Sequence, residues 1–171
     1  MPILKKFAAA LLGAAVLLFN DVVVGETTAQ PAAMPTAAAE LPARLASATD
    51  TAVFRRFTLD NGLRVLLVSD QKFNKSGAAL VAHTRQIDDP RNAEGMAHFL
   101  EHMLFLGTEK YPEVAEYGAF IRSNGGSNNA YTTSDHTNYQ FEIRHEALRG
   151  GLDRFAQFFI APKFNADFTA R

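Results

Sequence analysis

The sequence predicts an α+β fold of two layers, a mainly antiparallel sheet covered by helices on one face. Hydrophobic residues make up 47% of the 171-residue chain and include 14 Phe, which is enough to fill one core. The expected elements follow the order β-β-β-α-α-β-β-α. Because the strands come in groups and do not alternate with helices, antiparallel pairing is favoured over a parallel sheet.

The N-terminus is typical of a secretory signal peptide. Lys5 and Lys6 precede an apolar run from Phe7 to Phe19, which is shorter than the about 20 residues that span a bilayer. We expect residues 1–25 to be a signal peptide, with no stable membrane insertion after cleavage. An uncleaved anchor is the alternative. The chain has no Cys for lipid attachment, so a periplasmic or secreted product is expected.

Residues 26–51 are predicted to form a linker rich in Ala, Pro and Thr. Pro31, Pro35 and Pro42 are spaced so that no regular helix can run through the segment. Residues 52–171 are therefore expected to form the folded domain.

Three strands are expected at the start of this domain. Phe54 to Thr58 and Leu63 to Val68 are strand-like runs joined by Asp60-Asn61-Gly62, and Asn-Gly is a strong hairpin signal. A third run covers Ala78 to His83. Asp88 and Asp89 then shape a loop before Pro90.

A helix is predicted from Met96 to Leu106, with Asn92 as its N-terminal cap. This segment is apolar except at three positions, which are His98, Glu101 and His102. We expect such a helix to be packed on most of its sides.

The remaining elements are two helices and two strands. A helix fits Pro112 to Ser123, with Pro in its first turn. Strands are expected at Ala130 to Thr133 and at Thr137 to Ile143, where apolar and polar residues alternate. A last helix runs from Glu146 to about Ile160, and Gly150-Gly151 is expected to weaken it.

The spacing His-x-x-Glu-His points to a metal site. Four residues advance a helix by about 400°, so His98 and His102 lie on one face and reach one ion, with Glu101 on its flank. If all three groups are buried, a divalent cation compensates their burial. The alternative is two core histidines satisfied by hydrogen bonds.

Beyond this motif, the chain resembles a known family from about Phe54 to Arg171. The matching segments are Gly95 to Pro112, Asn129 to Thr132, His136 to Tyr139 and Leu152 to Phe159. They resemble the inverzincin zinc metallopeptidases, the family of pitrilysin, insulin-degrading enzyme and nardilysin.

The resemblance implies a role for each matching residue. His98 and His102 would bind one Zn²⁺ per catalytic domain, and Glu101 would take a proton from the water that attacks the scissile bond. Asn129 and Ala130 would belong to a strand that pairs with the substrate backbone. An ordinary edge strand is the alternative for those two. Cobalt or manganese can replace zinc at such ligands.

The resemblance also implies that residues 52–171 are the incomplete N-terminal part of a catalytic domain. The family's third ligand is a Glu in a helix that follows Phe164 to Arg171, and Glu142 and Glu146 do not match it. We expect a zinc metalloendopeptidase whose partners are peptide substrates and the missing C-terminal half. The alternative is a non-catalytic peptide-binding or scaffold subunit of the same fold.

The rest of the sequence adds no further partner. The formal net charge is −1, and the absence of a long run of like charges gives no indication of nucleic-acid binding. Histidines 83, 136 and 145 have no partner at ligand spacing, so structural or surface roles are expected for them.

Overall fold

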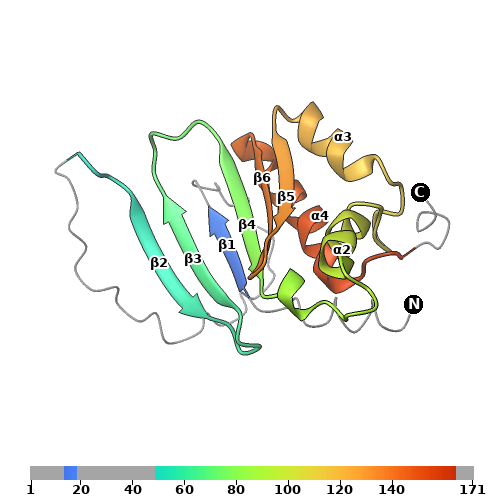
Figure 1. Ribbon diagram of the computed structural model, residues 1–171. Coiled ribbons are helices and arrows are strands. Elements are labelled where there is room, and N and C mark those ends of the chain that lie inside the picture. The colour runs from blue at the N-terminus through green and yellow to red at the C-terminus, as the bar shows by residue number, and fades with distance from the viewer. Residues whose placement is uncertain (1–13, 19–48, 165–171) are drawn as a thin grey trace.

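The computed structural model describes residues 14–18 and 49–164 (Figure 1). The predicted signal peptide outside residues 14–18, the predicted linker through residue 48, and residues 165–171 lie outside the described residues. Within the described part of the chain, no helix is both long enough and apolar enough to span a membrane.

The described strands form one six-stranded sheet with the order β2-β3-β1-β4-β6-β5. They are β1 (Ala14–Leu18), β2 (Val53–Thr58), β3 (Arg64–Ser69), β4 (Ser76–Ala82), β5 (Ser127–Thr132) and β6 (Thr137–Ile143). Every neighbouring pair is antiparallel except β1 and β3, which run parallel. The predicted α+β class with a mainly antiparallel sheet is confirmed.

Strand β1 was not expected from the sequence, because its residues lie inside the apolar run of the predicted signal peptide. In the described sheet it alone links the β2–β3 hairpin to β4, β6 and β5 (Figure 1). Its five residues pair with Arg64 to Val68 of β3, but on the other side only Val16 and Leu17 have partners in β4. The pairing of β1 with β4 is therefore shorter than its pairing with β3.

The predicted hairpin between β2 and β3 is confirmed. Leu59 N–H donates to Leu63 O at 2.8 Å, and Gly62 N–H donates to Leu59 O at 2.8 Å. Gly62 has a φ of 84°, a left-handed conformation that glycine adopts without strain.

The helices of the described chain pack on one face of the β4–β6–β5 half of the sheet (Figure 1). Their bounds are η1 (Gln86–Asp88), α2 (Met96–Leu104), α3 (Glu116–Ser123), η2 (His145–Ala147) and α4 (Leu148–Ile160). Alternate strand residues such as Leu80, Tyr139 and Phe141 join helix residues such as Leu104 and Phe158 in the core. The two-layer arrangement places α2 against β5 and β6.

The first turn of helix α2 is capped by a side chain from the preceding loop. Its N-cap is Gly95, at a φ of 86°, and a glycine has no side chain with which to cap. Asp89 accepts hydrogen bonds from the N–H groups of Gly95 and Ala97 at 2.8 and 2.9 Å. The prediction of Asn92 as the cap was wrong, because the loop brings Asp89 back over the first turn.

Helix α3 begins at Glu116, later than the predicted start at Pro112. The preceding residues bond to the loop after α2, where Thr108 N–H donates to Tyr111 O and Tyr111 N–H donates to Thr108 Oγ1. The Pro112 carbonyl lies against Gly107, so closely that a Cβ there would be 2.7 Å away. These contacts hold the segment outside the helix.

Two glycines in the first turn of α4 allow close packing. A Cβ at Gly150 would lie 2.7 Å from the Phe120 ring, and a Cβ at Gly151 would lie 2.8 Å from the Phe141 ring. Glycine costs helix propensity at both positions. At these two positions the absence of a side chain lets α4 contact α3 and β6 directly.

Candidate metal centre and catalytic site

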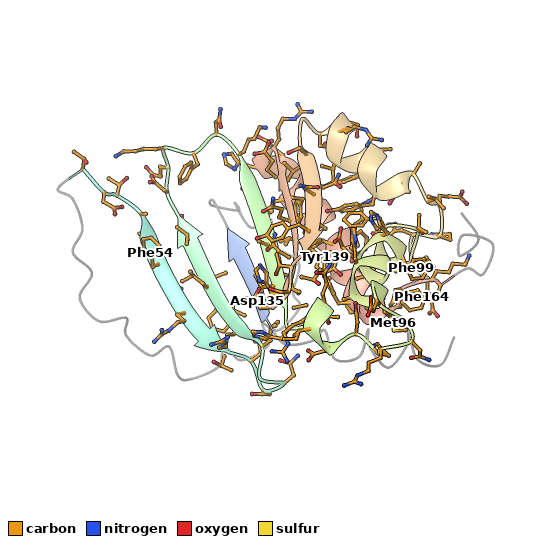
Figure 2. The ribbon with its side chains drawn as sticks, viewed as in Figure 1. Phe54, Met96, Phe99, Asp135, Tyr139 and Phe164 are labelled. Atoms are coloured by element: carbon orange, nitrogen blue, oxygen red, sulfur yellow. The ribbon has the colours of Figure 1, made fainter. Side chains whose placement is uncertain are left out.

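Helix α2 brings His98 and His102 together on one exposed face, as the spacing predicts. Their Nε2 atoms lie 3.1 Å apart and their ring centroids 4.7 Å apart. Figure 2 shows the helix that carries them, where the neighbouring Met96 and Phe99 are labelled. Two neutral imidazoles at this separation can share a proton or direct both lone pairs at one ion.

Glu101 occupies the same turns of the helix but points inward. It is 5% exposed and lies in the buried stripe that α2 turns toward the sheet. The expectation of a helix packed on most of its sides was wrong at the two histidines, which are exposed. The burial argument for a compensating cation therefore applies to Glu101 alone.

The three side chains nevertheless form one cluster. A ligand atom from each of His98, Glu101 and His102 lies within 4.8 Å of the others, and no other such group of His, Cys, Asp or Glu occurs among the described residues. Two imidazole nitrogens about 2.0–2.1 Å from a tetrahedral zinc lie about 3.3–3.4 Å apart. The observed 3.1 Å between Nε2 atoms fits that requirement.

Thr132 of β5 is a site residue that sequence reasoning missed. Its Oγ1 donates a hydrogen bond of 2.7 Å to Oε2 of Glu101. The only sequence signal was its position two residues after Ala130, which places both side chains on the same face of the strand. The contact itself depends on how α2 packs against β5.

Glu101 also lies close to the buried phenol of Tyr139. Tyr139 of β6 is 1% exposed and lies between the sheet and the helices (Figure 2). Burial, and secondarily the charge of Glu101, raises the pKa of the Tyr139 phenol well above its ordinary value. Tyr139 therefore stays neutral at physiological pH.

Asn129 and Ala130 lie in β5, which is the last strand at its edge of the described sheet. They pair with Gln140 and Tyr139 of β6, and the side of β5 away from β6 has no strand neighbour among the described residues. Asn129 is exposed and Ala130 is half-buried. An edge of this kind suits the predicted pairing with an extended peptide, which stays a prediction.

The remaining histidines and acidic candidates lie outside the cluster. His145 contacts Ser76 Oγ and Phe73 O, as expected for a structural histidine. His136 contacts Asp135 in the turn between β5 and β6. Glu142 pairs with Lys75 at 2.6 Å, so it does not serve as the third ligand.

The sequence of this chain matches a family of known proteins. The family described as Insulinase (Peptidase family M16) matches residues 64–171. The chain is 51% identical over 119 residues to insulin-degrading enzyme from Homo sapiens, covering 70% of this chain and 12% of that protein. It is 54% identical over 122 residues to a Caenorhabditis elegans protein provisionally named zinc protease C28F5.4, covering 71% and 14%.

Solved structures show the same fold. The crystal structure of pitrilysin matches with a TM-score of 0.70 and 37% identity, over 73% of this chain and 13% of that one. A protease from Helicobacter pylori matches with a TM-score of 0.61 and 26% identity, over 67% and 27%. The chain thus spans a small part of the length of the relatives that it matches.

Proposed function

Because the chain belongs to the insulinase family of peptidases, peptidase family M16, we propose that it forms the N-terminal part of a zinc-dependent endopeptidase domain. The observation that carries this proposal is the cluster of His98, Glu101 and His102 within 4.8 Å. Two exposed imidazoles that can bind a metal, with a buried carboxylate beside them that can act as a base, suit metal-assisted hydrolysis.

Each of the three residues has a distinct task. His98 and His102 would hold the metal through their Nε2 atoms, which lie 3.1 Å apart. The metal, when bound, supplies a Lewis acid that lowers the pKa of a water molecule toward ~7. Glu101 would act as the base that takes a proton from the attacking water and as the acid that returns it to the leaving amine.

The surroundings of Glu101 suit a base. The carboxylate is shielded from bulk solvent, and Thr132 fixes one of its oxygens. A fixed carboxylate needs little reorganisation when the proton moves.

The proposal places the other working parts outside this chain. Two histidines alone hold zinc weakly, since catalytic zinc sites have three protein ligands and one open position. A Glu from a helix beyond residue 171 would complete the set, and a second half of the protein would close over the substrate. This chain covers 12% of the human insulin-degrading enzyme and 13% of pitrilysin, so the relatives have ample further length for both parts.

Peptides are the proposed substrates, bound as an added strand at the edge of β5. Asn129 and Ala130 would offer backbone groups to the peptide next to α2. Backbone pairing tolerates many side chains, so broad sequence tolerance is expected. Export to the periplasm or outside the cell remains part of the proposal, on the basis of the leader sequence.

The test is Glu101→Gln in a chain extended through the following helix. Hydrolysis of a quenched fluorescent peptide should fall by several orders of magnitude while zinc binding persists, because Gln keeps the shape but cannot take the proton. Glu146→Gln, at an exposed position in η2, is the matched control and should retain activity. Full activity in the Glu101→Gln variant would contradict the mechanism.

A further inference from the structure

The hydroxyl of Thr132 is fixed as a donor to Glu101. Thr137, its partner in the β5–β6 register, is fully buried and donates to the Thr84 carbonyl at 2.9 Å. The oxygens of the two threonine hydroxyls lie 3.3 Å apart. A hydroxyl carries one proton, and that of Thr132 is directed at the carboxylate at 2.7 Å.

The Glu101 carboxylate lies where it could act either as a metal ligand or as a free base. One of its oxygens lies within 4.8 Å of nitrogen atoms of both histidines, close enough for a modest side-chain rotation to bring it to a shared ion. A carboxylate bound to the metal ceases to be a free base, while one held back stays able to take a proton. The hydrogen bond from Thr132 therefore determines whether Glu101 acts as a base or as a ligand.

We propose that Thr132 is a positioning residue whose hydroxyl holds Glu101 outside the ligand set of the His98–His102 site. The inference rests on the proposed function, because it assumes that the two histidines bind a metal. The bond ties an oxygen of Glu101 to β5, on a strand whose own position is set by pairing with β6. Without the hydroxyl, the buried Glu101 carboxylate loses this hydrogen bond. A nearby cation then becomes the most favourable partner for its charge.

Removal of the Thr132 hydroxyl should change the metal affinity in the opposite direction from removal of an ordinary supporting residue. A residue that merely supports a metal site weakens metal binding when it is removed. Loss of the Thr132 hydroxyl should instead strengthen binding, because the released Glu101 becomes a third ligand. The gain should disappear when Glu101 is replaced, which separates this effect from a general change in the fold.

The experiment is a Co²⁺ titration of the 171-residue chain, followed by visible absorption. Thr132→Val should bind Co²⁺ several-fold more tightly than the wild type and show a changed absorption band as a carboxylate joins the metal. Thr132→Ser keeps the hydroxyl and should match the wild type. Adding Glu101→Gln to Thr132→Val should return the affinity to the wild-type level or below.

Thr132→Ala is a second variant that removes the hydroxyl without adding a methyl group to the strand, and amide exchange of β5 and β6 verifies the fold. Unchanged or weaker Co²⁺ binding in both hydroxyl-free variants would overturn the positioning role. If Co²⁺ binds measurably to Thr132→Val but not to the wild type, the role of Thr132 is supported, and the two histidines alone bind the metal too weakly to be measured. If none of the variants binds Co²⁺, both the role of Thr132 and the two-histidine site fail.

Discussion

The carboxylate of Asp89 accepts a hydrogen bond of 2.9 Å from the backbone N–H of Ala97, eight residues further along the chain. Its other oxygen accepts a bond from Gly95 N–H. Asp89 thus caps the first turn of α2 immediately before His98. One side chain therefore connects the loop before α2 to the helix that carries the candidate metal site.

Replacing Asp89 with Ala should destabilise the protein by about 1 kcal/mol, because two N–H groups of the helix lose their acceptor. Thermal unfolding measures the loss, and amide exchange should be faster in the first turn of α2. Asn92→Ala is the control, since Asn92 is exposed in the same loop and should be near-neutral. Equal losses in the two variants would contradict the assignment of the cap.

Gly151→Ala should destabilise the protein although alanine is the better helix former. A Cβ at this position would lie 2.8 Å from the Phe141 ring in the core, and such overpacking costs about 1–3 kcal/mol. In Gly118→Ala of α3 the new Cβ meets only the end of the Arg122 side chain, so a gain of up to ~1 kcal/mol is expected. Chemical denaturation of both variants gives the comparison. Stabilisation by Gly151→Ala would rule out the close contact.

In the 171-residue chain with its N-terminal segment intact, proline at Val16 should loosen the attachment of the β2–β3 hairpin. Proline has no N–H for the ladder and is excluded from central strands, and β1 alone links β3 to β4 among the described strands. Exchange protection of β3 amides should fall roughly tenfold, the equivalent of about one lost ladder hydrogen bond, while β6 stays protected. Val16→Ala keeps the N–H and is the control. Unchanged protection of β3 would show that β1 is not needed to hold the hairpin.

Asp153→Asn should lower stability at neutral pH and have little effect in acid. Hydrogen bonds from Lys110 and then from Tyr111 hold the pKa of Asp153 below its ordinary value of 3.8. A carboxylate with a depressed pKa stabilises the fold above its unfolded-state pKa, and this contribution is lost as pH falls through the folded-state value. The melting temperatures of wild type and variant should therefore converge below about pH 4. Asp60→Asn, in the exposed β2–β3 turn, should show no such convergence.

Local patterns in the sequence were enough to predict much of the fold. Strand β6 was predicted with its observed bounds, because alternation of buried and polar residues is a property of the strand itself. The geometry of His98 and His102 followed in the same way from helical spacing.

Features that depend on distant segments were not predicted. The apolar run Ala14 to Leu18 did not by itself indicate a strand, because its partners in β3 and β4 lie much later in the chain. The bond from Thr132 to Glu101 and the cap by Asp89 arise where segments meet in space. The inward direction of Glu101, with the histidines exposed, likewise depends on how α2 packs against β5.

Zinc binding measured by titration calorimetry tests the central claim most directly. We expect weak binding by the 171-residue chain and tight binding of one zinc by a chain extended through the following helix, which supplies the third ligand. In the extended chain, His102→Ala should weaken binding by at least roughly a hundredfold, and His83→Ala, at an exposed position, should not change it. Tight binding that survives His102→Ala, or equally tight binding by the 171-residue chain, would contradict the account.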